Sequence, residues 1–153
     1  MKKLIAVSLG VVALVSAAFS HEGHEHATGV VRERMELMTD MGKRLLAISK
    51  RLRANKELDR ILPDARAIKN ASDKITSQFP PGSTQSPTAA KPAVWQQWDD
   101  FNEKAKKLQT EAEKLATMNP SDGDALRKQF RVVGFACDAC HEQYRIPKEN
   151  EKR

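Results

Sequence analysis

Apolar residues recur at alternating steps of three and four along four segments of the chain, a spacing that places them on one face of an α-helix. The first stripe is Val31, Met35, Met38, Gly42, Leu45, Ser49 and Leu52, widened by Val30, Leu37, Met41 and Ile48. The other three are Leu58, Ile61, Ala65, Ile68, Ser72, Ile75 and Phe79, then Trp95, Trp98, Phe101, Ala105, Leu108, Ala112 and Leu115, then Leu126, Phe130, Val133, Cys137, Cys140, His141 and Tyr144. No segment shows the alternation of a strand, so the stripes predict an all-α, antiparallel four-helix bundle with the aromatic residues in its core.

Proline residues mark where the middle helices are expected to begin and end. Pro63 has no N–H for a helix interior, so the second helix should begin close to it. The run Phe79-Pro80-Pro81-Gly82-Ser83 ends that helix, and the Pro- and Ser-rich stretch to Lys91 is the longest predicted loop. The third helix should open at Pro92, which suits a first turn.

The last helix has boundary signals of its own. Asn119-Pro120 ends the third helix, and Ser121 is a good N-cap for the fourth. Asp124, three residues further on, makes an approximate capping box with it. The fourth helix should end before Pro147, because proline cannot continue a helix.

Residues 1–20 have the three-part layout of a secretory signal peptide, with Lys2 and Lys3, then an apolar run, then small residues. The run is too short for a comfortable membrane span, and no second apolar run follows it. We expect cleavage between Ser20 and His21, export to the periplasm, and a mature chain without stable membrane insertion. An uncleaved N-terminal anchor is the alternative.

The segment 21–29 contains His21, His24 and His26 but no apolar periodicity, and it is expected to be a flexible tail. Because imidazole binds many divalent ions, metal scavenging is the alternative role. Residues 30–153 are then expected to form the bundle as one domain.

The formal net charge of +6 favours acidic partners at the encounter stage, although two of these charges leave with the leader. Lysine and glutamate alternate along the helices and do not form the basic stripe that nucleic-acid binding needs. Binding to nucleic acid is therefore excluded.

The two cysteines of the chain, Cys137 and Cys140, are followed at once by His141. C-x-x-C-H is the attachment pattern of a c-type haem, which needs two thiols for its vinyl groups and an imidazole for its iron. On a helix, residues at i, i+3 and i+4 share a face, so both sulfurs can meet one edge of the macrocycle and His141 can reach the iron.

Other interpretations of these residues explain less of the sequence. A zinc site would need a fourth ligand, and the remaining histidines lie far away in the N-terminal tail. A thioredoxin-like pair would need a βαβ context, and a structural disulfide leaves His141 unexplained. The pattern therefore predicts one covalent haem c.

With this motif at the end of its last helix, the chain resembles the class II cytochromes c, the cytochrome c-prime family. The resemblance covers residues 30–147 and is sharpest at 137–145, at the turn 79–83, and at the run from Trp95 to Phe101. Class I cytochromes c carry the motif near their N-terminus instead. The resemblance implies a homodimer through the first two helices as a possible assembly.

Members of this family differ in what occupies the sixth iron position, on the first helix. Low-spin members place a methionine there, four residues after an arginine, whereas high-spin members place a non-ligating side chain. The matching residue is Met38, four after Arg34, so the resemblance implies iron ligation by His141 and Met38. The alternative is that Met35, Met38 and Met41 only fill a flexible core.

Three further residues are candidates for haem contact. Arg34 could bind a haem propionate with its planar guanidinium, and Arg145 matches a basic residue that the family places on the proximal side. Tyr144 shares the haem-helix stripe with Phe130 and should turn its hydroxyl to a partner or to solvent. Each arginine could equally be a solvated helix charge.

These features predict a periplasmic electron carrier that exchanges electrons with redox partner proteins. We expect no enzymatic activity, because no second histidine lies in the predicted bundle to act as an acid or a base. The alternative is a high-spin cytochrome that binds NO or CO on the Met38 side.

Overall fold

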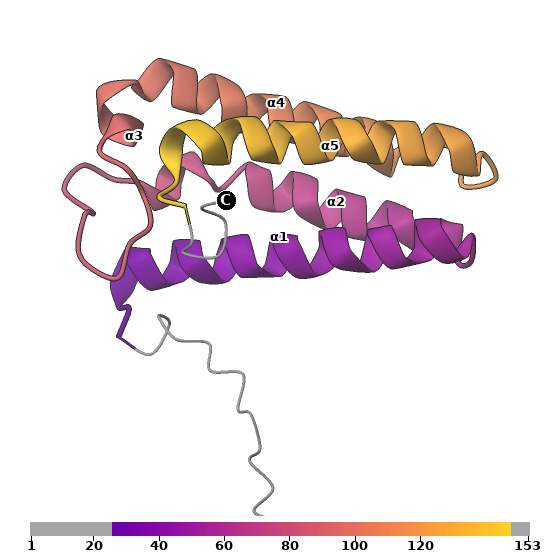
Figure 1. The fold of residues 1–153 in the computed structure, drawn as a ribbon, viewed down its shortest axis with the longest axis horizontal. Helices are drawn as coiled ribbons and strands as arrows, with labels where there is room; N and C mark the ends of the chain where they lie inside the picture. The colour runs from indigo at the N-terminus through magenta and orange to yellow at the C-terminus, as the bar shows by residue number, and fades with distance from the viewer. Residues whose placement is uncertain (1–25, 148–153) are drawn as a thin grey trace, which may run out of the picture.

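The computed structural model describes residues 26–147 of the 153-residue chain. Four long helices, α1 (Gly29–Ala54), α2 (Ile61–Ser72), α4 (Trp98–Ala116) and α5 (Gly123–Tyr144), lie side by side in an antiparallel bundle (Figure 1). Three short helices, η1 (Leu58–Arg60), η2 (Thr76–Gln78) and α3 (Ala93–Gln96), occur in the connections. The predicted all-α four-helix fold is confirmed; between residues 26 and 147 the only β pairing is an isolated bridge, Ala90 to Arg145.

Some predictions concern residues near the two ends of the chain, outside the range that the structure describes. The proposed leader 1–20 and residues 21–25 of the His-rich segment lie outside the described residues, as do residues 148–153. Ala27 is already buried, and α1 begins at Gly29, one residue before the expected boundary. From residue 26 to 147, none of the helices combines the length and apolar character needed to cross a membrane.

The buried face of α1 is rotated slightly from the expected stripe. Its buried residues are Val31, Arg34, Met41, Ile48 and Leu52. Gly42, which was expected on the midline of the stripe, is exposed. The residues of α1 that pack in the core therefore lie beside the expected stripe. Met38 and Gly42, which lie on that stripe, are not part of the fully buried core.

The stripe predicted for the second helix is confirmed almost residue by residue, because its buried residues are Ile61, Ala65, Ile68, Ser72, Ile75 and Phe79. The α2 helix begins two residues before Pro63, where the missing N–H costs nothing. It ends at Ser72, earlier than expected, and η2 carries the stripe on to Phe79. The Ser72 hydroxyl donates to the carbonyl oxygen of Ile68 at 2.8 Å, so this buried polar group is satisfied.

The third predicted helix is interrupted in the structure. The backbone leaves helical geometry at Gln97 (φ −125°, ψ 49°), which separates α3 from α4. Trp95 stays near the core and its indole N–H donates to the carbonyl oxygens of Phe79 and Pro80 at 3.1 and 3.2 Å. The core position expected for Trp98 is wrong: this residue is 36% exposed, because the interruption turns it toward the edge of the bundle.

The start of α5 also differs from the expectation. The N-cap is Asp122, not Ser121, because the Asp122 carboxylate accepts a hydrogen bond from the N–H of Ala125 at 2.9 Å. Asp124 does not close a capping box; its carboxylate pairs with Arg127 at 2.9 Å. As expected, α5 ends before Pro147.

The helices do not pack equally around the bundle. The α2 helix packs extensively on α4, α4 packs on α5, and α1 packs mainly on α2. Between α1 and α5 there is little contact. One side of the bundle is therefore open between the first and the last helix, and this is where the candidate site lies.

Candidate functional site

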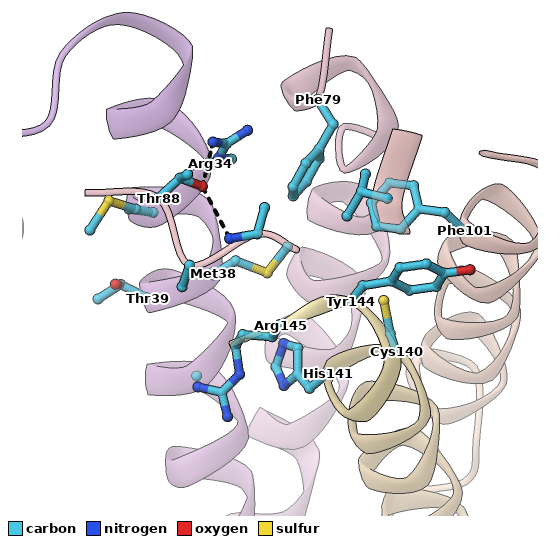
Figure 2. Close-up of a pocket in the computed structure, with 15 residues that line it drawn as sticks. Arg34, Met38, Thr39, Phe79, Thr88, Phe101, Cys140, His141, Tyr144 and Arg145 are labelled. Carbon is cyan, nitrogen blue, oxygen red and sulfur yellow. Dashed lines mark hydrogen bonds between the residues drawn. The ribbon is translucent and has the colours of Figure 1, made fainter. Parts of the chain in front are cut away.

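A cavity of about 500 Å³ lies between α1 and α5, within the range of about 300–1,000 Å³ that is usual for small-molecule sites. Its walls come from parts of the chain that are far apart in sequence (Figure 2). Met38 comes from α1, Thr88 from the long loop, Phe101 from α4 and His141 from α5. The cavity lining is mostly apolar.

The α5 helix presents the C-x-x-C-H residues on and beside this cavity. Cys140 and His141 line it, and Figure 2 shows the imidazole of His141 directed from α5 toward α1. Cys137, one turn earlier, does not line the cavity but packs half-buried against the core. Their placement follows from the helix, which puts the three residues on one face.

Burial raises the pKa of both thiols to about 11. The negative charge of Asp138 adds to this effect at Cys137, and at Cys140 the charge of Asp100 adds to it while Lys104 opposes it. Before they are joined to a cofactor, the two thiols are therefore protonated at neutral pH.

The three methionines of α1 are placed differently. Met38 and Met35 both line the cavity, whereas Met41 is buried in the hydrophobic core. Figure 2 shows the Met38 thioether reaching from α1 into the cavity. Met41 is therefore a core residue, and Met35 and Met38 are the two sulfur groups that border the site.

Arg34 lines the cavity but is only 3% exposed, and its guanidinium is directed to the loop. Nη2 donates to the carbonyl oxygen of Ser83 at 2.7 Å and to the Thr88 hydroxyl at 2.6 Å, and Nη1 donates to the Ser83 hydroxyl at 3.1 Å. Its Cζ lies 4.8 Å from the centroid of the Phe79 ring. Burial lowers the pKa of Arg34 from its ordinary value. The propionate contact proposed for Arg34 stays a prediction, and this residue is not a solvated helix charge.

Tyr144 lines the cavity, and Phe130, which shares its stripe, does not. The Tyr144 ring packs edge-on against Phe101 with centroids 5.2 Å apart. Its hydroxyl donates to the Asp100 carboxylate, so the expected polar partner is Asp100 on α4. Burial, with the charge of Asp100, raises the pKa of Tyr144, and the same hydrogen bond lowers the pKa of Asp100.

Arg145 lines the cavity at the end of α5, where the long loop pairs with the chain. The N–H of Lys91 donates to the carbonyl oxygen of Tyr144 at 2.9 Å, and the N–H of Ile146 donates to that of Ala89 at 2.8 Å. Thr88, Ala89 and Ala90 thereby form one wall of the cavity. Sequence reasoning missed this wall, because the loop has no periodic pattern that would place it.

The residues around the cavity fit a covalently bound haem. A flat apolar macrocycle suits a cavity lined by Phe79, Val94 and Phe101. An imidazole from α5 and a thioether from α1 enter from facing helices, and a cysteine that can form a thioether lies beside the imidazole. Cys137, Cys140 and His141 would hold the group, with Met38 or Met35 on the other side.

The chain is similar to proteins of one family in sequence. The sequence model of the family described as Cytochrome C′ matches residues 29–145. Cytochrome c-556 of Agrobacterium tumefaciens (strain II Chrys) is 34% identical over 127 residues, which cover 78% of this chain and 99% of that protein.

The same similarity is found among solved structures. Cytochrome c′ from Thermochromatium tepidum matches with a TM-score of 0.72 at 25% identity, covering 77% of this chain and 95% of that one. The nitric oxide complex of a mutant cytochrome c prime from Alcaligenes xylosoxidans matches with a TM-score of 0.70 at 26% identity, covering 78% and 94%.

Proposed function

This chain belongs to the cytochrome c′ family, and from that premise we propose that it transfers electrons through a haem whose iron is bound by both His141 and Met38. Members of the family bind haem c, with its iron, through covalent bonds to the haem, and the C-x-x-C-H motif of this chain lies at Cys137, Cys140 and His141. What the proposal adds to the family assignment is Met38 as the sixth ligand of the iron.

The placement of two side chains supports it. Met38 and His141 border the same cavity from facing helices, and both reach into it (Figure 2). A methionine thioether is a soft ligand that raises the reduction potential of haem iron. An iron held on both sides by the protein changes its geometry little between its ferric and ferrous forms, which favours outer-sphere electron transfer.

The other residues of the cavity orient the group and keep water from it. Thioethers at Cys137 and Cys140 would hold the haem to α5, the helix that also carries His141 as the ligand for its iron. Phe79, Phe101 and Tyr144 are buried and give the cavity an apolar wall. A low local dielectric of this kind is one of the means by which a protein sets a reduction potential.

The alternative function is the binding of NO or CO at an open sixth position. One observation favours it: a similar solved structure, the Alcaligenes xylosoxidans mutant, is a nitric oxide complex. The two functions differ in the coordination number of the iron, so one measurement separates them.

Absorption spectra of the purified ferric and ferrous protein, with and without CO, test the proposal. With Met38 as ligand the ferric protein is low-spin, shows the weak near-red sulfur-to-iron band, and the ferrous protein binds CO slowly or not at all. Met38→Ala should give a high-spin haem that binds CO and has a lower reduction potential. A wild-type protein that is already five-coordinate would establish the alternative.

Two matched variants separate ligation from packing. Met35→Ala removes the other sulfur that borders the cavity, and it should leave the spectrum low-spin. Met41→Ala removes a core side chain that is 5% exposed, and it should cost about 2–5 kcal/mol of stability without a spectral change. A high-spin spectrum in Met35→Ala alone would move the ligand assignment to Met35.

We also propose that the protein works in the periplasm, passes electrons between redox partner proteins and catalyses no reaction of its own. A homodimer through α1 and α2 stays a prediction. Asp64 of α2 pairs with Arg44 at 3.3 Å and Arg51 at 2.5 Å, so ion pairs link these two helices within one chain.

A further inference from the structure

Residues 83–91 form a strap that connects α1 to the end of α5 across the end of the cavity. At one end, Ser83 and Thr88 are bound by the guanidinium of Arg34 on α1. At the other end, Lys91 donates its N–H to the carbonyl oxygen of Tyr144. Helices α1 and α5 otherwise make little contact, apart from the bonds of Arg127 on α5 to Leu52 and Asn55 at the far end of α1, so the strap is the connection between the two helices beside the cavity.

The Arg34 end of the strap depends on the planar shape of one guanidinium. Its two terminal nitrogens donate to three oxygens of Ser83 and Thr88 at 2.6 to 3.1 Å, and its face lies over Phe79. The Thr88 hydroxyl also accepts from the N–H of Ala90 at 3.1 Å, which extends the network along the cavity wall (Figure 2). A lysine ammonium has the charge but not the fork, so it cannot make this set of bonds.

Arg34 lies one helical turn before Met38, and Thr88, Ala89 and Ala90 border the same cavity as Met38. We propose that Arg34 is a positioning residue that holds the strap, residues 83–91, closed over the cavity and thereby restricts the access of small ligands to the iron. The part that concerns ligand access rests on the proposed function; the part that concerns the strap does not. This role differs from a propionate contact, which needs the charge of Arg34 but not its bonds to the loop.

Hydrogen exchange of the holoprotein tests the strap directly. Arg34→Met should raise the exchange of the amides of Ser83, Thr88 and Ala90 by about tenfold or more, the factor that corresponds to one lost hydrogen bond to a charged group. Arg34→Lys should do the same. Arg32→Met is the matched control, because Arg32 lies on the same helix and pairs only with the exposed Glu36 among its described contacts; it should leave the exchange unchanged.

Thr88→Val tests the same network from the loop side. It removes the hydroxyl that accepts from Arg34 and Ala90 while keeping the shape of the side chain. The exchange at Ala90 should rise as it does in Arg34→Met. If Arg34→Met does not fold, Arg34→Lys and Thr88→Val carry the test. Unchanged exchange in the folded variants would overturn the proposal.

Ligand access is measured in a background that lacks the sixth ligand, which is Met38→Ala, or Met35→Ala if the spectra assign the ligand to Met35. Adding Arg34→Lys should increase the rate of CO association several-fold, and adding Arg32→Lys should not change it. Rescue of both exchange and CO rate by lysine would overturn the positioning role and assign Arg34 to charge binding. A five-coordinate wild type would overturn the proposed function but leave the exchange result standing.

Discussion

The buried carboxylate of Glu111 on α4 forms a hydrogen bond to α5, the helix that contains the C-x-x-C-H motif. Glu111 is 2% exposed, and its carboxylate accepts from Gln129 Nε2 of α5 at 2.8 Å. Lys107 and Lys114 of its own helix pair with it at 2.8 and 3.0 Å. These bonds, that of Lys107 first, lower the pKa of Glu111 to about 2.

The contributions of these partners differ because their exposure differs. The lysine side chains are 63% and 56% exposed, so Lys107→Ala and Lys114→Ala should each cost about 0–1 kcal/mol. The hydrogen bond from Gln129 links α5 to α4 and has a charged acceptor. Glu111→Gln should therefore lower the free energy of unfolding by about 1–3 kcal/mol. The bond between helices therefore outweighs the two surface pairs.

The same carboxylate makes stability depend on pH. Its pKa is lower in the folded chain than the value of 4.5 expected when it is unfolded, so its contribution is fully present above about pH 4.5. The contribution is lost as the pH falls from about 4.5 toward 2. Glu111→Gln should therefore have a shallower loss of stability in this range than the wild type.

Chemical denaturation of the holoprotein between pH 2 and 7, followed by circular dichroism, measures both effects. Glu113→Gln is the control, because Glu113 is exposed on the same helix and its loss should change neither stability nor acid slope. If Glu111→Gln cost less than either lysine variant, or kept the acid slope of the wild type, the reasoning would be refuted.

Two further predictions concern the attachment of haem and the maturation of the chain. Acid acetone should leave the haem on the polypeptide, and the double variant Cys137→Ala and Cys140→Ala should release it; free haem from the unmutated protein would contradict covalent attachment. The intact mass of the mature holoprotein should equal residues 21–153 plus one haem. A mass that retains residues 1–20 would show that the segment is an uncleaved anchor.

The regular part of the fold could be predicted from the sequence because burial follows helical periodicity. The stripe from Ile61 to Phe79 is buried as expected, even where the helix itself gives way to η2. The interruption at Gln97 could not be predicted, because neither Gly nor Pro stands there. It occurs where Trp95 bonds to the carbonyl oxygens of Phe79 and Pro80, a contact between segments that no local pattern encodes.

The exact start of α5 also could not be predicted from the sequence. Ser121 and Asp122 are adjacent residues of nearly equal capping preference, so composition indicates the boundary but not the capping residue. The choice depends on which side chain reaches the N–H of Ala125, and that of Asp122 does.

At the site, the residues on helical stripes could be placed in advance and those on the loop could not. Met38, His141 and Tyr144 border the cavity, as expected from their positions on the first and last stripes. The burial of Arg34 could have been predicted from its spacing. It lies three residues after Val31 and four before Met38, on the buried side of α1. A charged residue at such a position needs buried partners, but the sequence does not say that they are Ser83 and Thr88.

Because α1 packs mainly on α2 and little on α5, we expect it to separate from α5 more readily than α4 separates from α2 or α5. Cys137 and Cys140 lie on α5, so a displacement of α1 would expose them for the attachment of haem. The return of α1 would then bring Met38 to the cavity and close the side by which the cofactor enters.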